Sequence, residues 1–207
     1  MDRTVLPLFP YTIVAFPGVP VPLRFFEPRY KAMCEDIVGS TDEFGLVLAQ
    51  SGSQFEHEEP LDVGTVVRIA DHARLPDGQW LVQAVGVRRF RVRALGPRQP
   101  YLTAEVETIE EDLGNDLRAY ALRDSAVQRL RRLFALRTEF ETQALPVSIE
   151  LSAEPGAASY QIAAVMGLPT SAQQRVLEIT ADDDRLAAEV VLLEAAIAEV
   201  ERHLIGG

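Results

Sequence analysis

Prolines in the first thirty residues constrain the fold more than any other feature of this sequence. Residues 6–30 (LPLFPYTIVAFPGVPVPLRFFEPRY) are interrupted by Pro7, Pro10, Pro17, Pro20 and Pro22. Proline fixes φ and removes a backbone donor, so no regular helix can run through this stretch. The stretch must therefore consist of extended segments and turns.

Two strands and a helix are predicted within and just after this stretch. Residues 12–16 (TIVAF) are apolar and β-branched, which suits a buried strand. Pro17-Gly18 predicts a turn, because glycine accepts positive φ. Residues 19–25 predict an edge strand, with both of their prolines on one side. A helix is expected over residues 27–38, since Pro28 suits a first helical turn.

Further strands are expected at residues 44–50, 63–70, 80–87, 88–95 and 102–109, with Asp77-Gly78 as a hairpin turn. The segment 88–95 alternates strictly and places three arginines on one face, namely Arg89, Arg91 and Arg93. Antiparallel pairing with residues 102–109 would set this arginine row against Glu105 and Glu107.

The composition changes near Glu110, and helical patterns follow. Asn115 is expected to cap a helix whose apolar positions are Leu117, Tyr120, Val127, Leu130 and Phe134. Short helices are expected at 157–166 and 171–177, and Thr180 or Asp182 is expected to cap a last helix. We therefore predict two parts: residues 1–112, a twisted and partly closed barrel of about six strands, and residues 113–207, a helical bundle.

The last helix carries an apolar seam in alternating steps of four and three, formed by Leu186, Val190, Leu193, Ile197, Val200 and Leu204. Flanking alanines widen this stripe beyond the needs of a two-stranded coil. We expect the seam to pack inside its own bundle against the apolar positions of the first bundle helix. The alternative is that the seam pairs with a second copy of the chain. Because a broad stripe fits burial within one bundle better, a mostly monomeric protein is expected.

Several segments also resemble the N-terminal domain of Lon proteases, as found in free-standing bacterial Lon-N proteins. They are LPLFP, FPG-VPVPL, FEPRY, LDVGTVVRI, LPDGQW, VGVRRFRV and, more weakly, VLEITADDDRLAAEVVLLEAAI. The resemblance implies an α+β protein, in which a PUA-like twisted β-barrel domain with one inserted helix precedes an all-helical bundle. It also implies a non-catalytic module that binds unfolded or exposed polypeptide segments, with a protease or chaperone as a further partner.

Composition and missing motifs narrow the function. The net charge of −11 disfavours non-specific binding to nucleic acid and to anionic lipid. A single cysteine and the lack of a membrane-length apolar run predict a cytoplasmic protein. The sequence contains no GxxxxGK[ST] motif, and its one lysine, Lys31, lies within the Lon-like match. We therefore predict no enzyme, no cofactor and no ATPase or protease part; no nucleophile–base pair supports a small-molecule enzyme either.

Metal ligation is not expected. Cys34, His57, His72 and His203 are scattered without ligand spacing. The run Asp182-Asp183-Asp184 could hold a hard cation, but acidic residues also suit the first turn of a helix, which is the favoured interpretation.

Large apolar side chains are the candidate polypeptide contacts: Phe55, Trp80, Phe16 and Phe26. Core packing is the alternative for most of them, and it is weakest for Phe55, which lies in an acidic loop. An alternative function is RNA or nucleotide binding by the face of Arg89, Arg91 and Arg93. Only Phe90 interleaves with these arginines, so a solvated, ion-paired face is favoured.

Overall fold

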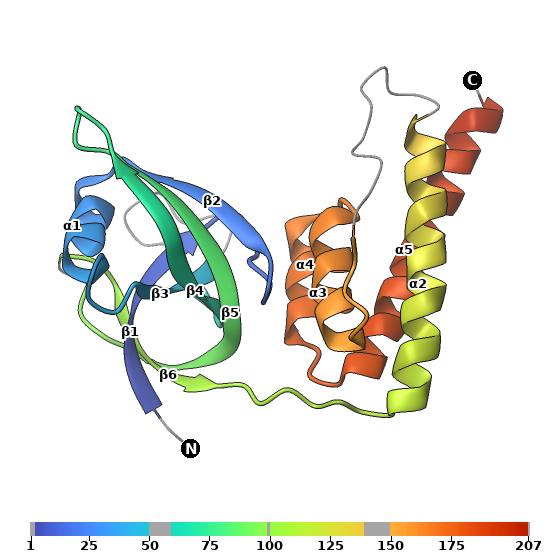
Figure 1. Ribbon diagram of the computed structural model, residues 1–207, viewed down its shortest axis with the longest axis horizontal. Coiled ribbons are helices and arrows are strands. Elements are labelled where there is room, and N and C mark those ends of the chain that lie inside the picture. The colour runs from blue at the N-terminus through green and yellow to red at the C-terminus, as the bar shows by residue number, and fades with distance from the viewer. Residues whose placement is uncertain (1–2, 50–58, 99, 139–149, 207) are drawn as a thin grey trace. The chain divides into compact units, whose positions relative to one another are not determined.

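The computed structural model describes residues 3–49, 59–98, 100–138 and 150–206. The chain divides into two compact units, Met1–Glu110 (unit 1) and Glu111–Gly207 (unit 2). Figure 1 traces the described strands and α1 in unit 1, and the other helices in unit 2.

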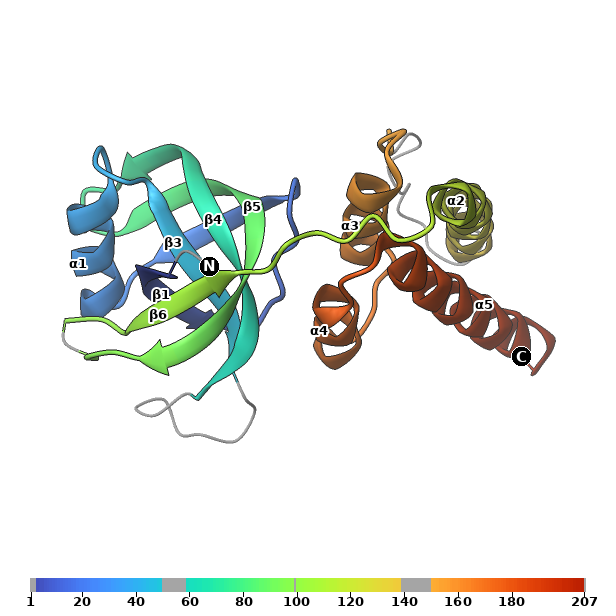
Figure 2. The same cartoon turned by 90° about the horizontal axis from the view of Figure 1, so that it is seen from below.

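Unit 1 consists of six described strands and one helix, α1 (Pro28–Ile37). Neighbouring strands follow the order β2-β5-β4-β3-β1-β6, and β5 also pairs with β6, so five of the strands form a closed circuit of pairings (Figure 2). β1 and β3 pair in parallel, whereas the other pairs are antiparallel. The strands are β1 (Arg3–Tyr11), β2 (Pro20–Phe25), β3 (Glu43–Ala49), β4 (Pro60–Arg74), β5 (Trp80–Leu95) and β6 (Thr103–Thr108).

An aromatic core holds unit 1 together. The ring of Phe9 lies 4.8 Å from that of Phe25 and 4.5 Å from that of Tyr30, which α1 contributes. A second apolar cluster surrounds Phe90. There, Gly45 and Gly64 are required, because a Cβ at either position would lie 2.7 or 2.9 Å from Cζ of Phe90. The interior of the strand circuit is thus filled by side chains.

The expected strand at residues 12–16 was wrong, because the first strand lies earlier, at β1. The apolar character of this segment correctly predicted that Ala15 and Phe16 are buried, but it could not show what they pack against. Instead of joining the sheet, this segment crosses β4 and β5: Thr65 donates to the carbonyl of Ala15 at 2.6 Å. The predicted turn at Pro17-Gly18 is confirmed, with Gly18 at φ 73°.

Residues 80–87 and 88–95 form one continuous strand, β5, rather than two. Its predicted antiparallel pairing with the glutamate-bearing strand is confirmed, with Arg91 opposite Glu107. Arg93 forms an ion pair with Glu107, and Arg3 of β1 pairs with Glu105 at 3.1 Å. The predicted helix after Glu27 is also confirmed, as α1.

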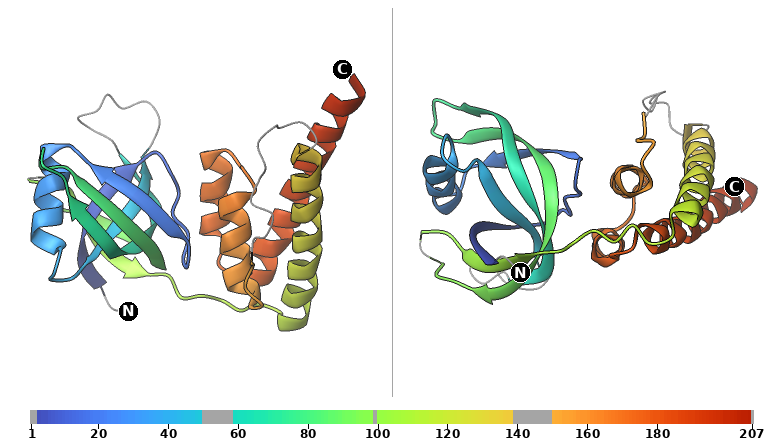
Figure 3. Two further views of the ribbon diagram at one scale, coloured as in Figure 1. Left: turned by 45° about the horizontal axis from the view of Figure 1, so that its top comes forward. Right: turned by 60° about the horizontal axis from the view of Figure 1, so that its bottom comes forward.

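Unit 2 contains, in its described residues, the helices α2 (Asp116–Thr138), α3 (Pro155–Val165), α4 (Thr170–Glu178) and α5 (Asp182–Gly206). The long helices α2 and α5 pack against each other, and α3 contacts both (Figure 3). The Asn115 side chain accepts a hydrogen bond from the N–H of Arg118 at 2.9 Å, which confirms the predicted cap. α5 begins at Asp182, so this residue lies inside the helix it was predicted to cap, and the N–H of Arg185 donates to the carbonyl of Ala181 before it.

Leu186, Leu193 and Ile197 of the seam are buried in this chain, but the partner face on α2 differs from the predicted one. Leu193 is fully buried, whereas Leu117 and Tyr120 are 86% and 46% exposed. The buried positions of α2 are instead Ala119, Ala126, Leu130 and Leu133. Alanine lets two helices approach closely, so the contact follows the small residues. Of the apolar positions predicted to face α5, Val127, Leu130 and Phe134 do belong to this cluster.

The fold is thus of mixed α+β class, as predicted, with a mixed sheet in one unit and helices in the other. Among the described residues, no helix combines the length and the apolar character needed to cross a bilayer.

Candidate functional site

The strand pair β2–β5 carries an apolar surface on its outer side. The register sets Pro20 opposite Val85, Pro22 opposite Gln83 and Arg24 opposite Leu81. Side chains directly opposite each other in an antiparallel pair lie within contact distance. With Phe26, which directly follows β2, these residues form what we call the β2–β5 outer face: Pro20, Pro22, Arg24, Phe26, Leu81, Gln83 and Val85.

Strand alternation explains why these side chains point outward. Val21, Leu23 and Phe25 of β2 are buried in the aromatic core, as are Trp80, Val82 and Ala84 of β5. The residues between them must therefore face away from the core. Phe26 remains 60% exposed and Leu81 42% exposed. Two large apolar side chains thus lie uncovered among exposed prolines.

The open edge of β2 is poor in hydrogen-bond donors. In the described sheet, β2 pairs with β5 alone, so its other edge is open. Pro20 and Pro22 lack an N–H, and main-chain groups alternate in direction along a strand. The main-chain groups of Val21, Leu23 and Phe25 must therefore form the hydrogen bonds to β5. The main-chain groups of Pro20, Pro22 and Arg24 then point to the open edge. A strand added there would meet few donors, so this region favours contact through side chains over strand addition.

The segment before β2 crosses β5 at Gly86. Gly18 donates to the carbonyl of Gly86 at 2.9 Å, and Gly86 donates to the carbonyl of Val19 at 3.1 Å. The Phe16 carbonyl lies so close to Gly86 that a Cβ there would collide with it. Glycine is therefore required at this crossing, which lies on the inner side of β5, because Gly86 alternates with the outward-facing Val85 and pairs with the buried Val67.

The predicted polypeptide contacts fall in different places. Phe26 lies on the β2–β5 outer face, and its role as a contact remains a prediction. Phe16 and Trp80 are packed inside, at 1% and 7% exposure, so the structure places them away from the surface. The Nε1 group of Trp80 is buried with no hydrogen-bond partner in the described ranges. Phe55 lies outside the described residues.

The arginine strand gives the RNA alternative no support. Arg89 is fully buried, and Arg93 is paired with Glu107. Arg91 lies opposite the same glutamate in the β5–β6 register. The three predicted residues therefore do not form a row of accessible guanidinium groups.

The residues considered for metal ligation do not converge. Cys34 is buried in the aromatic core, and this burial raises the pKa of its thiol to about 12. The ring of His72 packs 5.6 Å from that of Trp80, and His57 lies outside the described residues. Asp182 binds Arg185, and Asp183 binds Arg118 at 2.6 Å. No group of three potential ligands is found within the described part of the chain.

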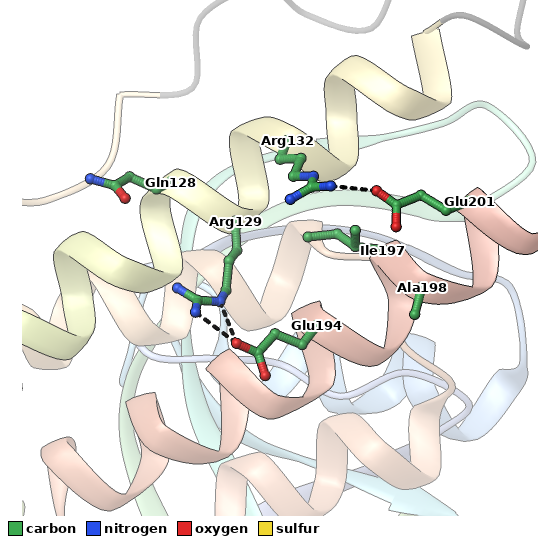
Figure 4. A pocket seen from close by; sticks show the side chains of 7 residues that line it. All are labelled: Gln128, Arg129, Arg132, Glu194, Ile197, Ala198 and Glu201. Carbon is green, nitrogen blue, oxygen red and sulfur yellow. Dashed lines mark hydrogen bonds and ion pairs between the residues drawn. The ribbon is translucent and has the colours of Figure 1, made fainter.

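A pocket of about 360 Å³ lies between α2 and α5 of unit 2 (Figure 4). Its charged groups already bind one another: Arg129 pairs with Glu194 at 2.6 Å and Arg132 with Glu201 at 2.5 Å. A ligand would have to displace these ion pairs, so the pocket is a weaker candidate than the outer face. The remaining lining residues are Gln128, Ile197 and Ala198.

Sequence reasoning missed a buried polar cluster in unit 2. Arg185 is fully buried; its Nε donates to the Ser159 hydroxyl at 2.9 Å, and its guanidinium lies 4.1 Å from the centre of the Tyr160 ring. Ser159 donates to Glu189 at 2.7 Å, and burial raises the pKa of the Glu189 carboxyl to about 8. The spacing of Asp182, Arg185 and Glu189 along one face of the helix was a usable signal. This cluster is inaccessible, so its role is structural.

The chain is similar in sequence to a known protein family. Residues 5–195 match the family described as the ATP-dependent protease La (LON) substrate-binding domain. Lon protease 4 of Sorangium cellulosum is 31% identical over 209 residues, which cover 99% of this chain and 26% of that protein. A Lon protease of Anaeromyxobacter dehalogenans is 29% identical and is covered to 21%. The chain therefore spans about a quarter of the length of these curated relatives.

Two solved structures share the fold. A Lon N-terminal domain protein from Xanthomonas campestris has a TM-score of 0.63 and 25% identity, and the match covers 89% of this chain and 95% of that one. The N-terminal domain of a Mycobacterium avium complex Lon protease has a TM-score of 0.65 at 17% identity, with coverage of 92% and 98%. The latter likeness concerns the fold alone.

Proposed function

Because this chain belongs to the family of Lon substrate-binding domains, we propose that it recognises polypeptide segments through the β2–β5 outer face and performs no chemistry itself. The observation that carries the proposal is the exposure of Phe26 and Leu81, at 60% and 42%, on a strand pair whose other face is fully packed. Burial of apolar surface is the main driving force for such an association.

The architecture favours a rigid platform over an adaptable groove. The strands of the face are held by the aromatic core around Phe9, and β5 belongs to the closed circuit of pairings. We take this circuit to be the PUA-like barrel that the resemblance to Lon N-terminal domains implies. A preformed surface spares the ordering cost of binding on the side of the protein.

The expected affinity is modest. Two exposed apolar side chains and two prolines offer a small contact area, and side-chain contact alone lacks the main-chain hydrogen bonds of strand addition. Small interfaces belong to weak, transient complexes. Such binding suits sampling of exposed segments before they pass to a second partner, for which a protease or a chaperone is the proposed class.

Fluorescence anisotropy tests this proposal. The probe is a second protein, fluorescently labelled and kept unfolded by reduction and carboxymethylation. The double variant Phe26→Ser, Leu81→Ser should bind about tenfold more weakly, because two apolar contacts are lost. Leu95→Ser is the matched control, since Leu95 lies on the same strand with 47% exposure but outside the face. Equal affinity of the double variant and the wild type would refute the assignment of the surface.

A further inference from the structure

Arg24 differs from most arginines of unit 1 in its partner. Six arginines of this unit form ion pairs with carboxylates: Arg3, Arg29, Arg68, Arg74, Arg88 and Arg93. Arg24 instead donates from Nε to the amide oxygen of Gln79 at 2.8 Å, and it has no carboxylate partner among the described residues. Arg91 and Arg98 also have no ion pair among the described residues, so what distinguishes Arg24 is its place among the apolar side chains of the β2–β5 outer face.

The single contact orients the guanidinium without neutralising it. The Gln79 side chain is itself held by Asp77, which accepts from its amide nitrogen at 2.8 Å. With Nε engaged, both terminal amino groups of Arg24 have no acceptor in the part of the chain that the structure describes. These two groups form the fork that binds a carboxylate through two parallel hydrogen bonds.

Apolar surface continues on both sides of this guanidinium. Along the strand, Pro22 lies two residues before Arg24 and Phe26 two residues after it, and Leu81 is directly opposite. A bound segment can therefore run past Arg24 in both directions. This arrangement fits an acidic residue within a segment better than a chain terminus.

Nearby acidic groups are already engaged, so they do not compete for Arg24. Glu27 pairs with Arg29 at 2.9 Å, and Asp77 accepts hydrogen bonds from Gln79. The other negative charges of the chain act over longer distances. Salt screens interactions between exposed charges beyond about 8 Å at physiological ionic strength.

We infer that Arg24 determines specificity on the β2–β5 outer face by binding the side-chain carboxylate of an aspartate or glutamate flanked by apolar residues. This inference rests on the proposed function and names the class of segment that the face selects: apolar sequence interrupted by an internal acidic residue.

A matched peptide series tests the inference. The probe is a labelled, amidated peptide with one glutamate between apolar residues, and its counterparts carry glutamine or lysine at that position. A further peptide carries glutamine there and a free C-terminal carboxylate. Affinities are measured by anisotropy for the wild type, Arg24→Gln and the control Arg68→Gln, with thermal unfolding confirming that each variant is folded.

The wild type should bind the glutamate peptide about tenfold more tightly than the glutamine peptide, as hydrogen bonds to a charged group predict. Arg24→Gln should lose this preference while still binding the glutamine peptide, and Arg68→Gln should keep it. Binding without a glutamate preference, or a preference that survives Arg24→Gln, overturns this inference alone. Preference for the free C-terminus over the internal glutamate overturns the assignment to an internal residue. Binding of no peptide overturns the proposed function, and the inference with it.

Discussion

The two units place acidic side chains differently. In unit 1, every described aspartate and glutamate keeps some exposure, and ion pairs such as Arg68–Glu43 lie at the surface. In unit 2, Asp182, Asp183 and Glu189 are buried. Unit 1 is stabilised by aromatic packing with no buried carboxyl group among its described residues, whereas unit 2 contains a buried carboxyl group whose raised pKa couples protonation to folding.

Side-chain size explains part of this difference. The interior of the strand circuit is occupied by rings, and Phe90 reaches the backbones of Gly45 and Gly64. Helix α3 is instead rich in alanine, with Ala158 and Ala163 fully buried. Small residues leave room for the long side chain of Arg185 against Tyr160. A charge that enters such a space needs partners, which Asp182 and Ser159 supply.

The largest expected effect comes from a charge placed in the α2–α5 interface. Leu193→Asp should unfold unit 2, because Leu193 is fully buried and an unpaired buried charge costs several kcal/mol. Far-UV circular dichroism should lose most of its helical signal. Fluorescence of Trp80, the single tryptophan, should still report a folded unit 1.

Val191→Asp is the matched control, since Val191 lies on the same helix at 63% exposure. Its helical signal should be that of the wild type. Retention of helix in Leu193→Asp would contradict the intramolecular packing of the seam. Light scattering on the wild type tests the expected monomer separately.

Truncation of an aromatic core residue should lower the stability of unit 1. Phe9→Ala removes a ring that contacts Phe25, Tyr30 and Phe44, and should cost about 3–5 kcal/mol of unfolding free energy. Urea titration followed by Trp80 fluorescence measures the loss. Because no buried carboxyl is involved, the cost should be the same at neutral and at mildly alkaline pH. A strong pH dependence would break the contrast between the units.

A smaller effect is expected from the pH dependence of unit 2. Burial raises the pKa of Glu189 from its usual 4.5 to about 8, so the folded state holds the proton more tightly than the unfolded state. The resulting stabilisation is complete below pH 4.5 and is lost as the pH rises through about 8.

Glu189→Gln should remove this dependence, because glutamine retains a hydrogen-bonding partner for Ser159 and cannot ionise. The wild type should lose on the order of a few kcal/mol across the window, measured by urea unfolding with circular dichroism. Glu194→Gln is the control, with its side chain 54% exposed. Parallel pH profiles for the wild type and Glu189→Gln would show that Glu189 does not titrate in this range.

The smallest stability effect is expected on the β2–β5 outer face. Phe26→Ala should change the unfolding free energy by no more than about 0.5 kcal/mol, because most of its side chain remains in water. Calorimetry measures this change, and Phe25→Ala provides the contrast, since the neighbouring ring is 1% exposed. A large loss from Phe26→Ala would mean that the ring supports the fold rather than a bound partner.

The candidate site was only partly readable from the sequence. Alternation in β2 and β5 was visible, and Phe26 was named as a contact. Leu81 and Arg24 were not named, because their significance depends on the pairing of strands that lie more than fifty residues apart. Phe16 and Trp80 are equally large and apolar, and only packing placed them inside.

Local features were determined by the sequence itself: the turn at Gly18, the start of α1 after Glu27, the Asn115 cap and the change from strands to helices. Each depends on backbone preferences and hydrogen bonds within a few residues, which local sequence encodes. Tertiary structure decided the closure of the strand circuit, the face of α2 that meets α5, and the burial of Arg185. These features depend on which distant surfaces fit together, and side-chain volume settles that choice only when the whole chain is packed.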